Sequence, residues 1–296
     1  MRDTFADYHP LVNFLYFTLV LAGAIVLLHP LAQVISLVCA TVYAVRQEGR
    51  KAVIFSLKFC LPMLLLTALV NPAFNHAGIT TLVYLPTGNP LTLESVLYGV
   101  SAGAMLATAL LWFRSFNRVI TSNQFIYLFG RILPALSLLL SMTLRFVPKF
   151  KAQMAVVAEG QRSIGRDPAE GSLLRRLRIA VTIVSIMITW SLENAIETAD
   201  SMKSRGYGLK GRTAFSIYRF NARDRTAMCW LGFCALYLLA GGLCSAYAFR
   251  YFPSIRGTEL SASVLCFYFV YFGLCITPVV LNAGEERRWN SILSKM

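Results

Sequence analysis

Long apolar runs, separated by short polar or proline-containing breaks, predict membrane-crossing helices along most of this chain. The six runs cover residues 11–28, 31–45, 52–70, 93–113, 227–249 and 261–282. A helix needs roughly 20 predominantly apolar residues to cross the hydrocarbon of a bilayer, and most of these runs approach that length. The pattern therefore predicts an all-α, polytopic membrane protein with about six transmembrane helices.

Basic residues are unevenly distributed among the segments that join these runs. Residues 71–94 contain no Lys or Arg, whereas residues 145–226 contain 15 of the 28 basic residues together with seven acidic ones. Lys and Arg collect in cytoplasmic loops of membrane proteins. We therefore expect 71–94 to be extracytoplasmic and 145–226 to be cytoplasmic, with both termini in the cytoplasm of a multi-pass cell-membrane protein.

A further apolar stretch, residues 119–147, must be reconciled with this topology. Four crossings precede it and two follow the basic segment, so the charge pattern is consistent only if the stretch makes no net crossing. Pro134 also interrupts it. We expect either a re-entrant or interfacial segment, or the apolar beginning of a long helix.

The composition supports a membrane location. The chain is 56% hydrophobic and 14% charged, whereas a soluble domain carries about 25% charged residues. The net charge of +14 is explained by cytoplasmic Lys and Arg near anionic headgroups, so we expect the lipid bilayer as a partner and no nucleic acid. The first ten residues lack a basic region and a cleavage site, so we expect the first run to remain as an anchor.

Two long helices are predicted within the basic segment, at about 136–164 and 172–205. Gly165 and Gly206 follow their last turns, where glycine takes a left-handed conformation without a Cβ clash. Ser172 is placed to cap the second helix. The chain is thus expected to comprise N-terminal transmembrane helices (1–135), a cytoplasmic coupling module (136–226), and C-terminal transmembrane helices with a tail (227–296).

Each of these helices ends with an arginine, Arg162 in the first and Arg205 in the second. The helix dipole alone favours a cation at such an end, by about 0.3–1 kcal/mol. Two observations point further: the feature occurs twice, and the helices carry apolar faces that a monomer would not leave bare. These faces comprise Ala152, Met154, Ala155, Val156 and Ala158, and Ala195, Ile196, Ala199 and Met202. A guanidinium also pairs with a carboxylate through two hydrogen bonds, which suits docking into an acidic socket.

These endings resemble a known family. AIETADSMKSRGYGLKGRT (195–213) and AVVAEGQRSIGRD (155–167) are similar to the two coupling motifs of the transmembrane T component of energy-coupling factor (ECF) transporters, the family that includes the cobalt transporter membrane subunit. NPAFNHAG (71–78) and GNPLTLES (88–95) resemble its extracytoplasmic loop and the start of the next helix. The resemblance extends from about His9 to the tail. The first motif departs from the family pattern, because its glycine is delayed to Gly165.

The resemblance implies a subunit that connects two ATP-binding cassette ATPases to a substrate-binding S component in the membrane, for uptake of a vitamin or metal ion. Arg162 and Arg205 would dock in grooves of the ATPases, and the short motifs would be completed by Gln161, Ser163, Ser204 and Gly206. Apolar faces between Met142 and Met202 would cradle the S component. The S component sets the substrate in this family, so the sequence of this chain does not name it.

Three other functions remain open on the sequence. A conventional ABC importer permease would use one short coupling helix with a Glu-Ala-Ala…Gly loop, which this chain lacks. A plain membrane scaffold would need neither arginine. An intramembrane enzyme would need more than His9, His29 and His76, of which the first two precede prolines at expected helix edges, and no HExxH, GxSxG or phosphate-binding GxxxxGK[ST] motif occurs.

No catalytic residue, cofactor or metal site is expected. The seven cysteines lie in apolar runs and form no CxxC pair, so we expect small buried hydrophobic side chains. Any ATP would be hydrolysed by a partner.

Two smaller patterns concern packing and the membrane surface. Gly103 among small neighbours, and Gly241 with Gly242, are expected to allow close approach of helices. A basic cluster is expected to face lipid headgroups, or alternatively an ATPase; it comprises Lys210, Arg212, Arg219, Arg223 and Arg225.

Overall fold

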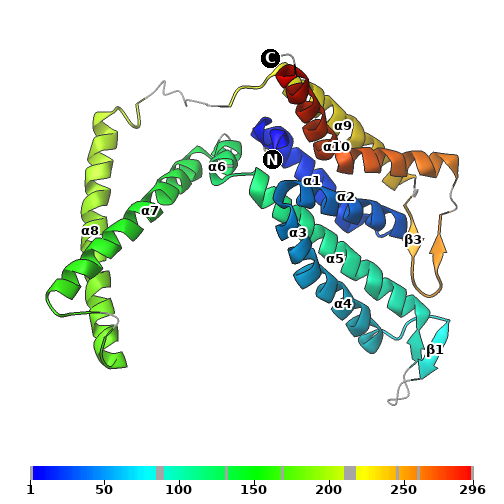
Figure 1. The fold of residues 1–296 in the computed structure, drawn as a ribbon, viewed down its shortest axis with the longest axis horizontal. Helices are drawn as coiled ribbons and strands as arrows, with labels where there is room; N and C mark the ends of the chain where they lie inside the picture. The colour runs from blue at the N-terminus through cyan, green and yellow to red at the C-terminus, as the bar shows by residue number, and fades with distance from the viewer. Residues whose placement is uncertain are drawn as a thin grey trace. The chain divides into compact units, whose positions relative to one another are not determined.

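The chain divides into two compact units, shown in Figure 1. The computed structural model describes residues 3–84, 90–130, 133–167, 170–209, 218–244, 247–258 and 261–294. Unit 1 comprises Met1–Phe125 and Tyr218–Met296, and unit 2 comprises Ile126–Ile217. The predicted all-α architecture is confirmed, while the division into segments 1–135, 136–226 and 227–296 stays a prediction.

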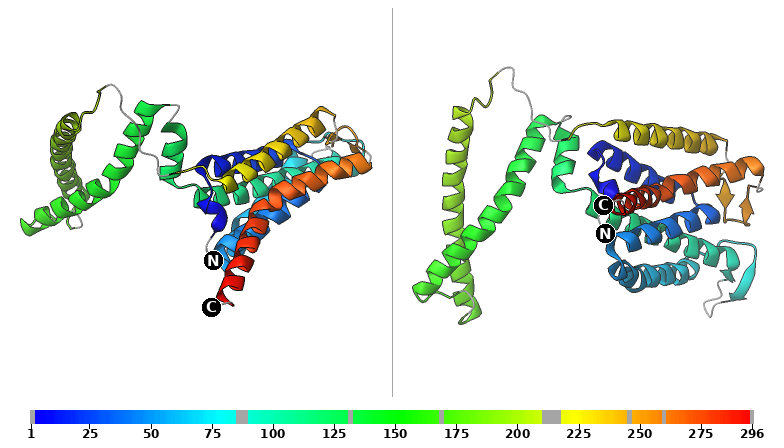
Figure 2. Two further views of the ribbon diagram at one scale, coloured as in Figure 1. Left: turned by 90° about the horizontal axis from the view of Figure 1, so that it is seen from above. Right: turned by 45° about the horizontal axis from the view of Figure 1, so that its top comes forward.

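Unit 1 is a bundle of apolar helices joined at one end by two short hairpins, which the apolar pattern did not predict. Its helices are η1 Thr4–Asp7, α1 Pro10–Val26, α2 Pro30–Glu48, α3 Arg50–Phe55, the π-helical turn η2 Ser56–Cys60, α4 Leu61–Phe74, α5 Leu93–Val119, α9 Ala222–Leu243 and α10 Ala262–Leu293. The antiparallel hairpins pair β1 Thr81–Tyr84 with β2 Pro90–Thr92, and β3 Phe249–Arg250 with β4 Arg256–Gly257. Both chain termini lie at the opposite end of the bundle (Figure 2).

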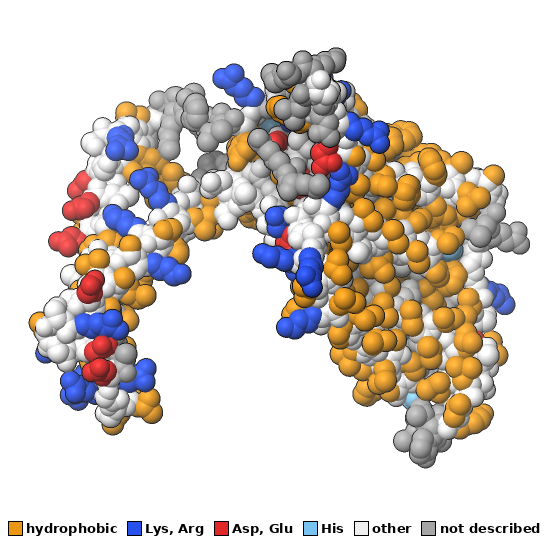
Figure 3. All heavy atoms as spheres, in the orientation of Figure 1, with side chains coloured by type: hydrophobic (Ala, Val, Ile, Leu, Met, Phe, Trp, Pro, Cys, Tyr) orange, Lys and Arg blue, Asp and Glu red, His pale blue; other side chains and the backbone are white. Residues whose placement is uncertain are grey.

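The polytopic membrane character is confirmed. Five helices of the described chain are long and apolar enough to cross a membrane: Arg50–Phe74, Leu93–Val119, Leu173–Ser204, Ala222–Leu243 and Ala262–Trp289. Pro10–Val26 is a shorter apolar helix. Hydrophobic side chains cover most of the face of unit 1 shown in Figure 3. Leu173–Ser204 falls in the segment predicted to be cytoplasmic, and the side of the membrane on which it lies stays a prediction.

Histidine–proline pairs begin the first two helices of the bundle. Pro10 and Pro30 occupy first-turn positions, where a missing N–H costs no helical hydrogen bond. The imidazole Nδ1 atoms of His9 and His29 accept from the backbone N–H groups of Leu11 and Leu31, each at 3.2 Å. The prediction that both histidines lie at helix edges is confirmed.

Aromatic side chains fill the core of unit 1. Trp112 of α5 is fully buried, and its Nε1 donates to Ser36 Oγ of α2 at 3.0 Å. Tyr16 and Phe17 of α1 meet the Trp112 ring edge-on, with centroids 6.1 and 6.5 Å away. The bonded indole N–H lets this large side chain be buried without an unpaired donor. Trp112 thus joins α1, α2 and α5.

Close backbone approach joins α4 and α5. A Cβ atom on Gly103 would lie 2.9 Å from Leu64 Cα and against Thr67 Oγ1, and one on Gly99 would lie 2.9 Å from the Thr67 carbonyl oxygen. Only glycine leaves room for this contact. The predicted role of Gly103 is confirmed; Gly241 is similarly crowded by Phe267 and Tyr247, whereas Gly242 has open space.

Charged and polar groups tie the helix ends together at the end of unit 1 that carries both termini. Glu48 at the end of α2 pairs with Arg114 and Arg118 near the end of α5, and Arg46 pairs with Glu286 of α10. Asp3 accepts hydrogen bonds from Tyr43 Oη, Gln47 Nε2 and Asn282 Nδ2 at 2.9, 2.7 and 2.8 Å. This end of the bundle is therefore more basic and polar than its middle.

Removing the carboxylate of Asp224 should destabilise unit 1. Asp224 is 1% exposed; Oδ1 accepts from His9 N at 3.0 Å and Oδ2 from Asn221 N at 2.9 Å, which joins the starts of α1 and α9. We expect Asp224→Ala to lower the free energy of unfolding by about 1–3 kcal/mol, because two part-buried hydrogen bonds to a buried carboxylate are lost. Asp224→Asn, which keeps one acceptor, should lose less. Thermal unfolding in detergent measures both, and an unchanged midpoint for Asp224→Ala would contradict this role.

Candidate functional site

Two long helices make up most of unit 2, and their predicted bounds are confirmed closely. α7 spans Pro134–Ser163 and α8 spans Leu173–Ser204, after a short helix α6 at Ser122–Gly130. The apolar stretch 119–147 contains α6 and the beginning of α7, so the predicted alternative of an apolar beginning of a long helix is confirmed for its second half. Ser172 lies at the predicted capping position with extended backbone (φ −65°, ψ 155°), but its side chain makes no capping hydrogen bond.

The two helices cross, as Figure 1 shows, and they contact each other through a small apolar cluster. Ile179, Ile183 and Met187 of α8 are buried against partly buried side chains of α7 and α8: Phe150, Val157, Ala158 and Trp190. Phe146 stacks on the Trp190 ring at 5.7 Å, and Lys149 Nζ donates to Asn194 Oδ1 at 2.9 Å. This contact holds the middle of each helix and leaves their ends projecting.

Most of the apolar surface predicted on these helices is not used by their mutual contact. Val156 remains 61% exposed and Ile196 65% exposed, and Met154 is exposed as well. Ala195 and Ala199 are also exposed. Contiguous apolar surface of this kind is typical of an interaction site or of contact with lipid.

The first helix end, at the end of α7, is a Schellman motif, in which glycine closes the last turn. Gly165 has φ +78°, its N–H donates to the Arg162 carbonyl, and Arg166 N–H donates to the Gln161 carbonyl, each at 2.9 Å. Ser163 Oγ donates to the Gly160 carbonyl at 2.9 Å. The last carbonyls of α7 are thus bonded internally, so the Arg162 side chain is not needed to cap them.

The second helix end, at the end of α8, repeats this backbone geometry. Gly206 has φ +79°, its N–H donates to the Lys203 carbonyl, and Tyr207 N–H donates to the Met202 carbonyl, each at 3.0 Å. Ser204 Oγ donates to the Ser201 carbonyl at 2.9 Å. The resemblance between the two endings is therefore one of hydrogen-bonding pattern as well as of sequence.

Superposing the two motifs on their glycines shows that Arg162 and Arg205 are not in equivalent positions. Gly165 corresponds to Gly206 and Ser163 to Ser204, so Arg162 corresponds to Lys203, and Ile164 to Arg205. Arg162 lies inside the last turn of α7, whereas Arg205 lies one residue beyond the end of α8. The two ends present cations from different positions on a shared backbone framework.

The local partners of the two arginines also differ. Arg162 Nε lies 3.2 Å from Asp167 Oδ2, and the two side chains are 58% and 27% exposed. Arg175 of α8 donates from Nη2 to the Gly165 carbonyl at 3.2 Å, so three guanidinium groups, with Arg166, lie around the first end. Arg205 is exposed, and no carboxylate within the described residues pairs with it. An exposed ion pair such as Arg162–Asp167 contributes only about 0–1 kcal/mol and exchanges readily for another partner.

Lys203 and Asp167 were not predicted as site residues from the sequence. The shared Ser-x-Gly spacing, Ser163–Gly165 and Ser204–Gly206, is the signal that could have aligned the endings and identified Lys203. The Arg162–Asp167 pair depends on the turn that follows α7, which the spacing alone does not specify. Gln161 is partly buried and Gly206 half-buried, while Ser163 and Ser204 are exposed.

Alanine at either closing glycine should loosen the corresponding helix end. A residue with a Cβ in the left-handed region costs roughly 1–2 kcal/mol, and Gly165 has open space around it, so backbone strain alone should act there. We expect Gly165→Ala and Gly206→Ala to accelerate hydrogen exchange of the Arg166 and Tyr207 amides. Gly160→Ala, inside α7 with no neighbour within 4 Å, should instead stabilise its helix. Equal exchange in all three variants would contradict the Schellman assignment.

The chemistry available at these ends is recognition of negative charge. Over the described residues, no group of three His, Cys, Asp or Glu side chains is placed to hold a metal ion.

The cysteines and the basic cluster lie outside the two helix ends. Cys39, Cys60, Cys234 and Cys275 are buried as predicted, whereas Cys229, Cys244 and Cys266 are exposed. Of the basic cluster, Lys210 and Arg212 lie outside the described residues, while Arg219, Arg223 and Arg225 are exposed.

Comparison with known proteins finds similarity to transmembrane proteins of energy-coupling factor transporters. The chain is 34% identical over 109 residues to the energy-coupling factor transporter transmembrane protein EcfT 1 of Listeria monocytogenes, covering 36% of this chain and 39% of that protein. It is 32% identical over 96 residues to EcfT of Lactobacillus helveticus (32% and 35% covered) and 33% identical over 90 residues to EcfT of Lactococcus lactis (30% and 34% covered). No family model matches. The matches span less than two fifths of these relatives, and over that length they confirm the resemblance to the T component of ECF transporters.

Proposed function

We propose that this chain is the transmembrane coupling subunit, or T component, of an energy-coupling factor importer. The observation that carries the proposal is the pair of glycine-closed, cation-bearing helix ends in a polytopic protein with sequence similarity to EcfT. The chain passes the conformational change of ATPases to a substrate-binding S component and is itself not catalytic. The transported substrate, a vitamin or a metal ion, is set by that S component.

The helix ends are the proposed docking sites for two ATP-binding cassette ATPases. Arg162 and Arg205, with Gln161, Ser163, Ser204 and Gly206, enter grooves lined with acidic groups. Because both last turns close their own carbonyls, the cationic side chains are free to face a partner rather than cap the helix. Arg162 exchanges Asp167 for the acidic groups of the ATPase, whereas Arg205 needs no such exchange. Lys203, the counterpart of Arg162, lies at the same end as Arg205 and adds charge there.

The exposed apolar faces of α7 and α8 are the proposed contact for the S component. Their mutual contact covers only the middle of each helix and leaves Val156, Ile196 and Met154 open. Methionine adapts to partners of different shape, which suits a subunit that meets more than one S component.

We propose that α7 and α8 lie on the cytoplasmic side rather than across the bilayer. α8 satisfies the length and composition of a membrane span. Its stretch without charged residues, however, runs only from Ile179 to Leu192. At about 1.5 Å per residue this is roughly 21 Å, less than the ~30 Å of hydrocarbon that a crossing helix must span. Arg175, Arg176 and Arg178 precede the stretch, consistent with an interfacial position and with cytoplasmic termini.

Affinity purification from native membranes tests the proposed function. The tagged chain, extracted in mild detergent, should bring along two ATP-binding cassette ATPases and a small, very hydrophobic protein, whose identity would point to the substrate. Several such small proteins would indicate a shared coupling subunit. ATPases accompanied by a separate substrate-binding protein of the conventional kind would favour an ordinary ABC importer. If a folded chain brought along no ATPase, the proposal would be wrong and a scaffold role would be favoured.

A further inference from the structure

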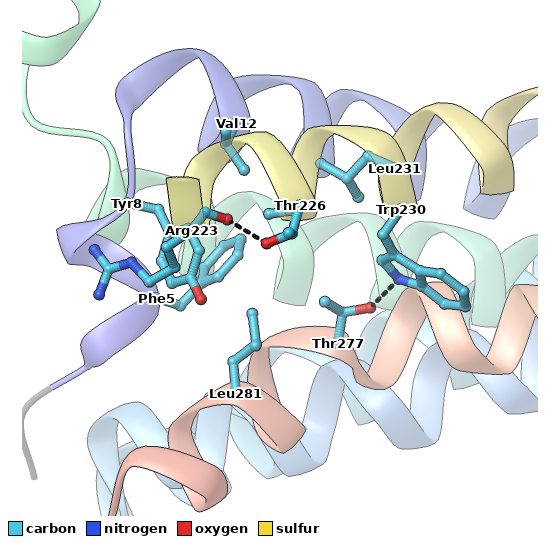
Figure 4. Close-up of a pocket in the computed structure, with 10 residues that line it drawn as sticks. Phe5, Tyr8, Val12, Arg223, Thr226, Trp230, Leu231, Thr277 and Leu281 are labelled. Carbon is cyan, nitrogen blue, oxygen red and sulfur yellow. Dashed lines mark hydrogen bonds between the residues drawn. The ribbon is translucent and has the colours of Figure 1, made fainter. Parts of the chain in front are cut away.

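A slot between α9 and α10 has no role in the proposed coupling. It is a cavity of about 190 Å³ between the first turns of α9, the second half of α10, and the N-terminal segment of η1 and α1. Figure 4 shows Arg223 at one end of this α9–α10 slot and Trp230 at the other. The residues from α9 are Arg223, Thr226, Ala227, Trp230 and Leu231, which follow one face of the helix. The slot lies entirely within unit 1.

The interior of the slot suits hydrocarbon rather than water. Its walls include Val12, Ala227, Leu231 and Leu281. The hydroxyl of Thr277 accepts from Trp230 Nε1 at 3.1 Å and donates to the Gly273 carbonyl at 2.7 Å, and Thr226 Oγ1 donates to the Arg223 carbonyl at 2.8 Å. The hydroxyls of Thr226 and Thr277 and the indole N–H of Trp230 are thus already bonded within the protein. A water molecule needs 2–4 polar partners, and beyond Arg223 these largely apolar walls offer few.

The mouth of the slot carries a positioned cation. The guanidinium of Arg223 lies over the Tyr8 ring at 4.2 Å, and one N–H donates to the Asp7 carbonyl at 3.2 Å. A guanidinium has five N–H donors, so several remain available. Across the part of the chain that the structure describes, no carboxylate pairs with Arg223, since the neighbouring Asp224 is occupied by the His9 and Asn221 amides. Tyr8 holds the guanidinium in place through the cation–π contact.

The surroundings identify the ligand as a lipid. α9 and α10 are both long and apolar enough to span a membrane, and they expose large side chains such as Phe233, Leu236 and Phe269. In a membrane, hydrocarbon would therefore lie against α9 and α10, and Arg223 lies near the start of α9, where headgroups would be. Other basic side chains, Arg225 and Arg288, are exposed at the same helix ends.

We propose that the α9–α10 slot binds one anionic phospholipid, with an acyl chain between α9 and α10 and the headgroup phosphate on Arg223. The chemistry of the slot combines an apolar channel with a single unpaired guanidinium, which matches an acidic amphiphile. A free phosphate would leave the apolar walls empty, and a zwitterionic lipid would bring a second cation to the mouth. This assignment depends on the membrane location of unit 1 and does not depend on the coupling function.

Lipid retention measured by native mass spectrometry tests the proposal. The full-length chain is reconstituted in nanodiscs with equal amounts of phosphatidylglycerol and phosphatidylcholine and released into mild detergent. We expect one phosphatidylglycerol to be retained in preference to phosphatidylcholine. Because a charge-assisted hydrogen bond to the phosphate is lost, Arg223→Ala should reduce that preference roughly tenfold or more. Ala227→Phe, which fills the slot, should abolish retention of either lipid.

Arg225→Ala is the matched control, because Arg225 is an exposed arginine of α9 that does not line the slot. It should leave retention unchanged. Brominated-chain phosphatidylglycerol should also quench Trp230 fluorescence more strongly than brominated phosphatidylcholine, and this component should vanish in Trp230→Phe. The fluorescence measurement is made on the chain that keeps Arg223, so it does not depend on how well Arg223→Ala folds.

Three outcomes would overturn the proposal. Equal retention of the two lipids would show that the charge of the headgroup does not determine binding. An equal loss in Arg223→Ala and Arg225→Ala would indicate a diffuse basic surface instead of one site. Retention and quenching that survive in Ala227→Phe would show that the lipid lies outside the slot.

Discussion

The chain with both Arg162→Ala and Arg205→Ala is expected to lose its ATPases on purification and to fail to support uptake. Removing one partner of a buried charge pair costs about 2–5 kcal/mol, so loss of both arginines should lower the affinity for the ATPases by several orders of magnitude. The backbone of both ends is closed by Gly165 and Gly206 without help from these side chains, so the helices themselves should remain folded. The measurement is co-purification of the ATPases from native membranes, with uptake assayed in the same cells.

The double variant needs a control that removes the same charge elsewhere on the same helices. Arg145 of α7 and Arg178 of α8 are both exposed and lie away from the two ends, so Arg145→Ala with Arg178→Ala should retain the ATPases. Arg205→Lys should give an intermediate result, because lysine keeps the charge but loses the two-pronged geometry of the guanidinium. If the Arg162/Arg205 variant still held its ATPases, the docking assignment would be wrong, and the arginines would be ordinary helix-end cations.

Gly103→Leu is expected to disrupt the bundle of unit 1. A Cβ at this position would lie 2.9 Å from Leu64 Cα and 3.0 Å from the Leu64 carbonyl oxygen, both backbone atoms that cannot rotate away. Overpacking a well-packed interior costs about 1–3 kcal/mol, and contact with backbone places this substitution at about 3 kcal/mol or more, because α4 and α5 must separate. We expect a marked fall in the thermal unfolding midpoint in detergent.

Gly242→Leu supplies the matched control for Gly103→Leu. Gly242 is also a helical glycine of an apolar helix in unit 1, but no atom lies within 4 Å of its Cβ direction. The same increase in volume should therefore leave the midpoint nearly unchanged at this position. Similar losses in the two variants would show that the close α4–α5 contact does not govern the stability of unit 1.

The helices could be predicted because the signals that start and end them lie between residues that are neighbours in sequence. The apolar runs, the prolines after His9 and His29, and the glycines after residues 164 and 205 act through neighbours in sequence, so the sequence alone located α1, α7 and α8 to within about two residues. The two short hairpins were missed because their strands are only two to four residues long and carry no alternating pattern.

The candidate site was predicted in part, for a similar reason. Both cationic endings were recognised, because a glycine-closed helix end is specified by adjacent residues. The different positions of the two arginines are visible in the sequence, because Arg162 precedes Gly165 by three residues and Arg205 precedes Gly206 by one. Only the structure showed that the two glycines close the same hydrogen-bonding pattern, in which Arg162 corresponds to Lys203. The ion pair between Arg162 and Asp167 likewise depends on the turn that follows α7.

The sequence by itself determined that the chain is a polytopic α-helical membrane protein with two cation-bearing helix ends, because hydrophobic period, charge placement and glycine caps are local properties. Only the tertiary structure decided which glycine is indispensable for packing, how Asp224 joins α1 to α9, and that Tyr8, Arg223 and Trp230 meet around one slot. The contacts of Gly103 with Leu64, of Asp224 with His9 and of Arg223 with Tyr8 each join residues more than 30 positions apart in the chain, and they arise from the mutual packing of helices, which no single segment encodes.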